Sequence, residues 1–119
     1  MDSFTDLHAW QKGMDLMEEV YLLTKKFPKA EQYGVTSQVR RAATGILANI
    51  AEGFSRSTSG DKAYKYTIAC GECAEVHSLL LASIRLGYLT KEDADHAIQI
   101  ALEVGRLLSG LVQKYSSQS

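Results

Sequence analysis

Apolar residues recur every three or four positions along most of this chain, which is the period of an amphipathic α-helix. The pattern predicts four helices, at about residues 6–26, 36–54, 61–86 and 91–115. Helices of about 20 residues with short connections fold as an antiparallel bundle. We therefore expect an all-α fold, an up-down-up-down antiparallel four-helix bundle, with residues 1–119 as a single domain.

The expected helix ends carry capping signals. Pro28 ends the first helix, because the residue before a proline is pushed away from helical geometry. Thr36 is the expected N-cap of the second helix. Gly87 stands where a left-handed cap should end the third helix, and Thr90 opens the fourth, with Asp93 as its capping-box partner.

The outer helices each show one apolar stripe that we expect to face the core. In the first helix the stripe is Leu7, Trp10, Met14, Met17, Tyr21 and Thr24. In the fourth it is Ala94, Ala97, Ile98, Ala101, Val104, Gly105, Leu108, Leu111, Val112 and Tyr115. A single stripe of this kind is what a bundle helix needs.

The two central helices have more than one patterned face. The second helix has a core stripe of Val39, Ala42, Ala43, Ile46, Ile50 and Gly53, and beside it a line of Gln38, Arg41, Gly45, Asn49, Glu52 and Arg56. The third has a core face of Tyr66, Ala69, Cys70, Cys73, Val76, His77, Leu80 and Ile84, and opposite it Ile68, Glu72, Glu75, Leu79 and Leu86. Because patterned second faces in a small bundle usually meet another subunit, we expect a homo-oligomer; the alternative is scattered surface apolar residues.

The polar line supports two interpretations. As a structural network, its side chains would fix how helices and subunits meet, because buried polar groups must be paired. As a functional groove, Asn49 and Glu52 would bind or act on a ligand. No nucleophile or metal set accompanies them, so we favour a structural or interface network, whose members would be Gln38, Arg41, Asn49, Glu52, Glu72 and Glu75.

Arginines of the second helix are the candidates for contact with nucleic acid. Arg40, Arg41 and Arg56 could hold phosphates, because a guanidinium matches phosphate oxygens in two parallel hydrogen bonds. Alternatively, Arg40 and Arg41 pair with the carboxylates of Glu72 and Glu75. Both interpretations stay open at this point.

Cys70, Cys73 and His77 share one face of the third helix, which raises the question of a metal site. That face is also the expected core stripe, where small thiols pack well. A redox motif would instead start a helix beside a βαβ unit. We therefore expect no metal, no cofactor, no catalytic residue and no small-molecule substrate, and an enzyme is not predicted.

Composition and the pattern at the N-terminus bear on the expected partners and the expected location of the protein. The chain is 45% hydrophobic with a net charge of −1, so it lacks the basic excess typical of many nucleic-acid-binding domains. No apolar run approaches the ~20 residues of a membrane span, so no membrane partner is expected. The first residues do not resemble a secretory signal, and the expected location is the cytoplasm.

The motif on the second helix resembles the 23S rRNA intervening-sequence protein family. Its residues are Gln38, Arg40, Arg41, Ala42, Ala43, Ile46, Asn49, Ile50, Ala51, Glu52, Gly53 and Arg56. Shorter stretches resemble the family in the same order: Phe4, Leu7 and Trp10-Gln11-Lys12; Phe27-Pro28, Glu31 and Tyr33-Gly34; Ala69, Gly71 and Glu75; and Leu86-Gly87-Tyr88-Leu89. Two positions depart from the pattern, Gly45 and Glu72, where serine is usual.

The resemblance implies a four-helix bundle that assembles as a ring-like homopentamer without enzymatic activity. Some family members are encoded inside insertions in 23S rRNA genes, and related accessory proteins of diversity-generating retroelements bind nucleic acid and a reverse transcriptase. The expected function is thus a homo-oligomeric module that binds RNA, DNA or a nucleic-acid-processing partner. The alternative is an oligomeric protein-interaction scaffold without a nucleic-acid role.

Overall fold

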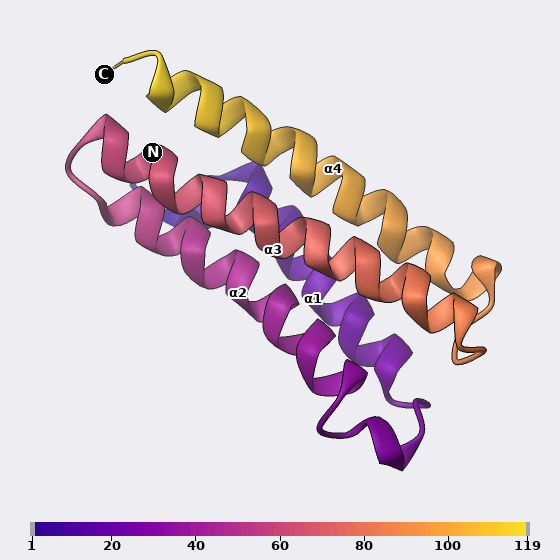
Figure 1. Cartoon of the computed structure of the whole chain (residues 1–119). Helices are drawn as coiled ribbons and strands as arrows, with labels where there is room; N and C mark the ends of the chain where they lie inside the picture. Colours follow the sequence, from indigo (N-terminus) through magenta and orange to yellow (C-terminus); the bar gives the residue numbers. More distant parts are fainter. Residues whose placement is uncertain (1, 119) are drawn as a thin grey trace.

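The computed structural model describes residues 2–118 as an all-α, up-down four-helix bundle (Figure 1). The long helices are α1 (His8–Thr24), α2 (Val35–Ser55), α3 (Ser59–Arg85) and α4 (Lys91–Ser116). Two short 3-10 turns, η1 (Phe4–Asp6) and η2 (Lys29–Glu31), precede α1 and α2. Consecutive helices pack together and α1 also packs on α4, which closes the bundle.

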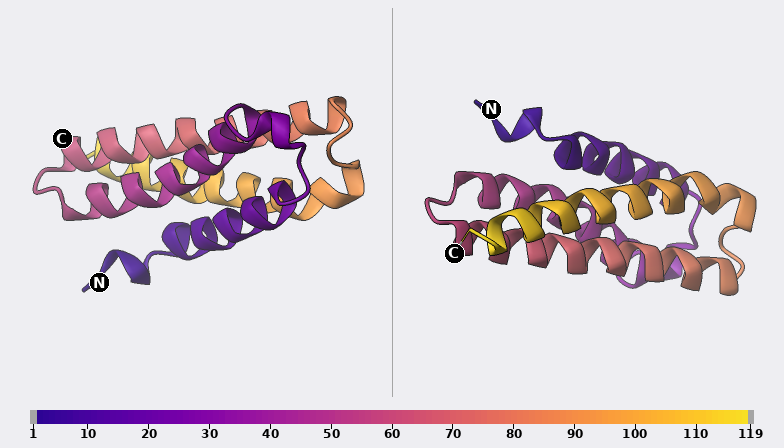
Figure 2. Two further views of the ribbon diagram at one scale, coloured as in Figure 1. Left: turned by 90° about the horizontal axis from the view of Figure 1, so that it is seen from below. Right: turned by 90° about the horizontal axis from the view of Figure 1, so that it is seen from above.

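The bundle is elongated, with extents of 45 × 24 × 21 Å. The α2–α3 turn and both described chain ends lie at one end, and η2 and the α3–α4 turn lie at the other (Figure 1). Helix α1 diverges from the other three helices toward the N-terminus (Figure 2). The predicted fold class is therefore confirmed.

The caps at both ends of the α3–α4 turn are as predicted. Gly87 has a φ of 82°, a left-handed conformation that favours glycine. Thr90 accepts a hydrogen bond from the Asp93 N–H at 3.0 Å, while the Asp93 carboxylate accepts one from the Thr90 N–H. This reciprocal capping box fixes the start of α4.

The predicted start of α2 was wrong. The helix begins at Val35 after Gly34, and Thr36 lies buried in its first turn, where its hydroxyl has no hydrogen-bond partner. The capping acceptor is instead the side chain of Glu31, which accepts a hydrogen bond from the Val35 N–H at 3.2 Å. A carboxylate supplied from the preceding connection replaces the expected threonine cap.

The predicted bounds of α1 and α3 also differ from the structure. Residues Phe4–Asp6 form a separate 3-10 turn, so α1 begins only at His8 and ends at Thr24, inside the predicted residues 6–26. Helix α3 begins at Ser59, two residues early, because the Thr58 hydroxyl accepts a hydrogen bond from the Asp61 N–H at 3.1 Å. Thr58 was an unrecognised N-cap.

The core stripe of α2 matches the prediction, whereas that of α1 matches it in part, since Leu7 and Thr24 are buried and Trp10 and Met17 pack against the core. All six predicted residues of α2 are buried. In α1, Ala9, Gly13, Leu16, Val20 and Thr24 are buried, whereas Tyr21 is 37% exposed and Trp10, Met14 and Met17 are half-buried. Gly13 sits tightly against α2, since a Cβ there would lie 3.1 Å from Leu47 Cδ2. The pattern of large apolar side chains did not indicate Gly13, whose lack of a side chain lets α1 approach α2 closely.

The core of α3 is rotated slightly from the prediction. Ala63 and Ser83 are buried, and Ser83 satisfies its hydroxyl by donating to the Leu79 carbonyl at 2.7 Å. Cys70, His77 and Ile84 are only half-buried, toward α4.

Helix α3 is unusually apolar for a bundle helix. Within the described residues it is the one helix long and apolar enough to cross a membrane by length and composition, but only 28% of its most apolar window of 18 residues is buried. It packs on α2 at one flank and α4 at the other, as a bundle helix does. Its exposed large apolar side chains are Tyr64 and Leu81.

Candidate interaction surface on α2 and α3

The centre of the α2–α3 seam is a close approach between a glycine and a carboxylate. A Cβ built on Gly45 of α2 would lie 2.8 Å from the Glu72 carboxyl carbon and 2.9 Å from both of its oxygens. Only glycine lets the Glu72 side chain rest in this position, directly against the α2 backbone. The two positions that depart from the family pattern are therefore in contact with each other.

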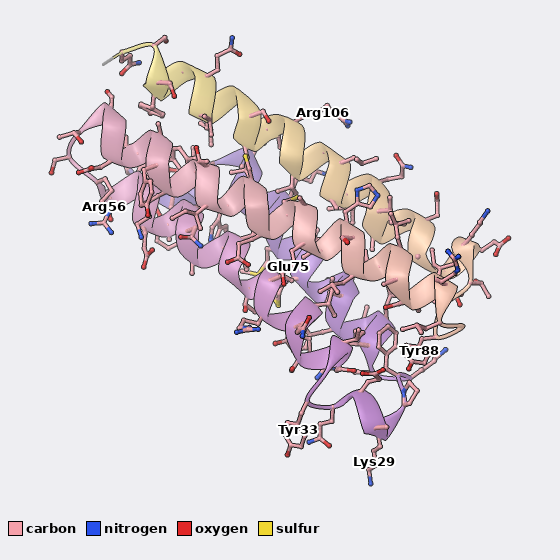
Figure 3. The ribbon with its side chains drawn as sticks, viewed as in Figure 1. Lys29, Tyr33, Arg56, Glu75, Tyr88 and Arg106 are labelled. Atoms are coloured by element: carbon pink, nitrogen blue, oxygen red, sulfur yellow. The ribbon has the colours of Figure 1, made fainter. Side chains whose placement is uncertain are left out.

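The surroundings of Glu72 disfavour its charge. Partial burial raises the pKa of Glu72, the neighbouring Glu75 raises it further, and Arg41 lowers it. Within residues 2–118 the Glu72 carboxylate accepts no hydrogen bond and forms no ion pair shorter than 4.0 Å. Glu75 projects from the same part of α3 (Figure 3). Arg41, Glu72 and Glu75 thus form one electrostatic cluster, here called the seam cluster.

The other predicted network residues of α2 lie on the same side of the helix but, within the described chain, form no hydrogen bond or ion pair with the seam cluster. Asn49 donates through Nδ2 to the Gly45 carbonyl at 2.9 Å, which is a contact within its own helix. Glu52 pairs with Lys65 of α3 at 3.1 Å. Gln38 is exposed one turn before Arg41. The structure therefore assembles Arg41, Glu72 and Glu75, and leaves Gln38, Asn49 and Glu52 outside that cluster.

The three candidate phosphate-binding arginines differ in their surroundings. Arg40 donates through Nε to Thr24 Oγ1 at 2.8 Å, and its guanidinium lies 4.6 Å from the centre of the Tyr21 ring. These contacts tie Arg40 to α1. Arg41 is exposed beside Glu72, and Arg56 is exposed after the last turn of α2, near the α2–α3 turn (Figure 3).

Comparison with known proteins identifies the family. The model of the 23S rRNA-intervening sequence protein family matches residues 5–110. The chain belongs to this family. Comparison with curated proteins gave no match.

A solved structure is similar over most of its length. It is a protein of unknown function from the S23 ribosomal protein family of Bacteroides thetaiotaomicron, with 25% sequence identity and a TM-score of 0.80. The similarity covers 87% of this chain and 97% of that one. The fold of this 23S rRNA-intervening sequence family member is therefore shared with that protein.

The thiols of this family member are packed and weakly acidic. Cys73 donates through its thiol to the Ala101 carbonyl at 3.1 Å, and burial raises its pKa to about 11, with a further contribution from Cys70. Burial also raises the pKa of Cys70, while a hydrogen bond with Ser109 lowers it. Across residues 2–118 no three His, Cys, Asp or Glu side chains are grouped to hold a metal ion. Cys70, Cys73 and His77 instead line an open groove between α3 and α4.

A second polar site, which residue patterning missed, joins two connections of the bundle. Tyr88 donates through Oη to Glu31 Oε2 at 2.7 Å, and its ring packs on Phe27 with centroids 5.4 Å apart. Hydrogen bonds from Tyr88 and then from the Val35 N–H lower the pKa of Glu31. Periodicity gave no signal for this contact, because both residues lie outside the long helices. Both do belong to the short stretches that resemble the family.

Two lysines of α3 were also missed. Lys62 donates through Nζ to the Phe54 carbonyl at 2.7 Å, which satisfies an acceptor at the end of α2. Lys65 neutralises Glu52. The sequence did contain a signal for these contacts. Two lysines that closely follow a short turn can reach back to the helix before that turn.

Proposed function

We propose that this protein is a non-enzymatic homo-oligomeric helical-bundle module, pentameric and cytoplasmic, that binds RNA or a nucleic-acid-processing partner. The observation that carries the assembly is the apolar surface that one copy leaves uncovered. Tyr64 and Leu81 of α3, Leu86 directly after α3 and Leu22 of α1 are each at least 50% exposed. Apolar patches of this kind usually mark protein contacts.

The assembly is tested by the mass of the purified protein in solution. Light scattering after size-exclusion chromatography should give a mass several times the 13.1 kDa of one chain, and five times that value for a pentamer. A mass of 13.1 kDa at micromolar concentration would contradict the proposal.

Support for nucleic-acid binding comes from two sources. The family is named for sequences that intervene in 23S rRNA. Arg41 is exposed on α2 and Arg56 directly after its end, about 22 Å away along the helix axis at 1.5 Å per residue, and oligomerisation would repeat both in each copy. Repetition raises the local density of cations even when the net charge per chain is −1.

The test is the salt dependence of RNA binding. Labelled single-stranded and hairpin RNAs should bind more weakly as salt rises, because each phosphate contact releases counterions. Arg56→Ala should weaken binding and flatten the salt slope. Lys29→Ala is the matched control, since it removes one exposed cation at the opposite end of the bundle (Figure 3). Binding that does not change with salt, or that Lys29→Ala weakens equally, would refute this role of Arg56.

A second candidate function is a protein-interaction scaffold without a nucleic-acid role. The seam cluster favours it, because Glu72 and Glu75 place negative charge beside Arg41 and oppose a phosphate there. Under this alternative, the unpaired Glu72 carboxylate receives a basic side chain of a protein partner. Absence of RNA binding at low salt, together with an intact oligomer, would favour the scaffold over the first proposal.

A further inference from the structure

Helices α3 and α4 lie side by side along the bundle (Figures 1 and 2), and a groove follows their outer side. Its central part has a volume of about 610 Å³ and is lined largely by small side chains, including Ala74 and Gly105. On the next turns of the same helices, toward the α3–α4 turn, an apolar hollow of about 420 Å³ lies between Leu81, Ile84 and Ile98. The groove therefore contains two hollows, one after the other along the helix axes.

Two glycines of α4 in this groove have no packing role within one copy. In the described chain, a Cβ built on Gly105 or Gly110 would meet no other part of the molecule within 4 Å. Glycine disfavours a helix relative to alanine, so the bundle by itself gives no reason for glycine at either position. Where two packed helices carry small residues, a third helix can approach them closely from outside.

The charged side chains that line the groove are mostly cations. Arg106 lines the central part and projects from the outer side of α4 (Figure 3), whereas Arg85 and Lys91 line the apolar hollow. Among the described lining residues the acid is Asp95, one turn from Lys91 on α4, and Glu75 of α3 belongs to the seam cluster beside α2. Within residues 2–118, Arg85 and Arg106 form no ion pair shorter than 4.0 Å. The groove thus offers an unpaired cation at each hollow.

The length of the groove and the spacing of its hollows define what a docked helix would need. Along α4 the lining runs from Lys91 to Gln113, which is about 33 Å at 1.5 Å per residue. Asp95 and Arg106, one from the lining of each hollow, are about 16.5 Å apart by the same measure. This distance is about three helical turns, so large apolar side chains about 11 residues apart on one helix face would reach both hollows.

We propose that the α3–α4 groove binds an acidic amphipathic helix of a partner protein. Large apolar side chains of that helix enter the two hollows, and Asp or Glu side chains beside them pair with Arg85 and Arg106. Each long helix of this chain already packs its core face within its own bundle, so a helix with a free apolar face of this length comes from another protein. The proposal rests on the partner-binding part of the proposed function, and it names the surface and the chemistry of the partner.

Selection from a peptide library tests the chemistry of the partner. A phage-displayed library of helix-forming peptides of about 22 residues, the length of the groove at 1.5 Å per residue, is selected on the purified wild-type protein. The selected peptides should carry large apolar residues about 11 positions apart, and more Asp and Glu than Lys and Arg. A selection that yields no binder, or binders without an excess of acids, would overturn the proposal.

Gly105→Leu tests the groove itself, because the new side chain occupies its floor. The Cβ position is open and leucine favours a helix more than glycine does, so the variant should fold. It should weaken binding of a selected peptide by at least about tenfold, measured by fluorescence anisotropy. Gly60→Leu is the matched control, since Gly60 is also a helical glycine with open space at its Cβ position but lies outside the groove. If the peptide bound both variants equally well, the groove would not be its site.

Charge reversal tests the pairing with acids. Arg106→Glu should weaken binding of the selected peptide, and a peptide with lysines in place of its acids should bind this variant better than it binds the wild type. Lys29→Glu makes the same change of charge at an exposed cation outside the groove and should leave binding unchanged. Equal binding by Arg106→Glu and wild type would contradict recognition of the acids by this arginine.

Two further measurements separate this proposal from the proposed function. Light scattering should give Gly105→Leu the mass of the wild type; a smaller mass would make the groove a contact between copies and overturn the proposal, while the oligomer would stand. Weaker RNA binding by Gly105→Leu would instead assign the groove to nucleic acid, which also overturns the proposal. A wild-type protein that binds the peptide but no RNA would refute the RNA part of the proposed function alone.

Discussion

Glu31 lies against a glycine directly before α2 and Glu72 against a glycine within α2, and the two carboxylates have opposite surroundings. Glu31 lies beside Gly34 and receives hydrogen bonds from the Tyr88 hydroxyl and the Val35 N–H. Glu72 lies against Gly45 with Arg41 nearby but receives no hydrogen bond in the described chain. The pKa of Glu31 is lowered and partial burial raises that of Glu72.

The difference shows what each carboxylate does for the molecule. Donors that favour the charged form turn Glu31 into a structural link between the first connection and the α3–α4 turn. Burial beside a second carboxylate makes the charge of Glu72 a cost to folding in one copy. One glutamate therefore stabilises the bundle, and the other leaves an unsatisfied acceptor on its surface.

Among the substitutions that test this comparison, Glu31→Ala is expected to lower the stability of the folded protein most. The substitution removes the acceptor for the first turn of α2 and the partner of Tyr88 at once, so the midpoint of chemical unfolding should fall more than in any other variant considered below. Tyr88→Phe, which removes one of the two hydrogen bonds, should give a smaller decrease in the same direction. Equal stability of Glu31→Ala and wild type would show that the link is not structural.

Acidification should change the contributions of the two carboxylates to folding stability in opposite directions. The Glu31 contribution is present above the ordinary glutamate pKa of 4.5 and is lost as pH falls through the lower folded pKa, because the folded state must then take up a proton. The cost of charged Glu72 is present above its raised pKa and disappears as pH falls below 4.5. Unfolding curves from about pH 7 to pH 3 should therefore show Glu31→Gln and wild type converging in stability on the acid side.

Glu72→Gln should raise stability near neutral pH, since it removes a charge that burial and Glu75 disfavour. The gain should vanish below pH 4.5, where Glu72 is protonated in both folded and unfolded chains. Chemical denaturation of the variant and wild type, near neutral pH and below pH 4.5, measures this gain in stability. A loss of stability at neutral pH would mean that Arg41 outweighs burial and Glu75.

The smallest change in the free energy of unfolding is expected from Gly45→Ala. Alanine favours a helix over glycine by up to about 1 kcal/mol, but its Cβ must displace the Glu72 carboxylate, which is the mobile end of a side chain. The net change in unfolding free energy should be a gain smaller than about 1 kcal/mol. Gly53→Ala is the contrasting variant, because its Cβ would lie 2.7 Å from a buried Tyr66 ring that cannot move away, and it should lose stability.

The four helices and the core stripe of α2 could be predicted because their aliphatic residues follow the helical period. The stripe of α1 could be predicted only in part, since Ala9 and Gly13 are buried although they are not large apolar residues, and Gly13 lies tightly against α2. Tyr21, an expected core residue, is partly exposed under Arg40.

The candidate site was only partly predictable. The spacing placed Arg41, Asn49 and Glu52 on one side of α2, but spacing along one helix does not determine which bonds form across helices. Arg40 bonds to Thr24, which is 16 positions earlier, and Glu52 bonds to Lys65 of the next helix. Glu31 and Tyr88 are 57 positions apart in two connections, where no periodicity operates.

The two ends of the bundle are chemically different, and a closed ring would inherit that difference. One end holds the α2–α3 turn with Arg56, and the other holds η2, the α3–α4 turn and the Glu31–Tyr88 link. If copies are related by rotation about an axis along the bundle, all like ends fall on one side. The assembly is then a disc with two dissimilar sides, and a flat partner would have to approach it from a defined direction.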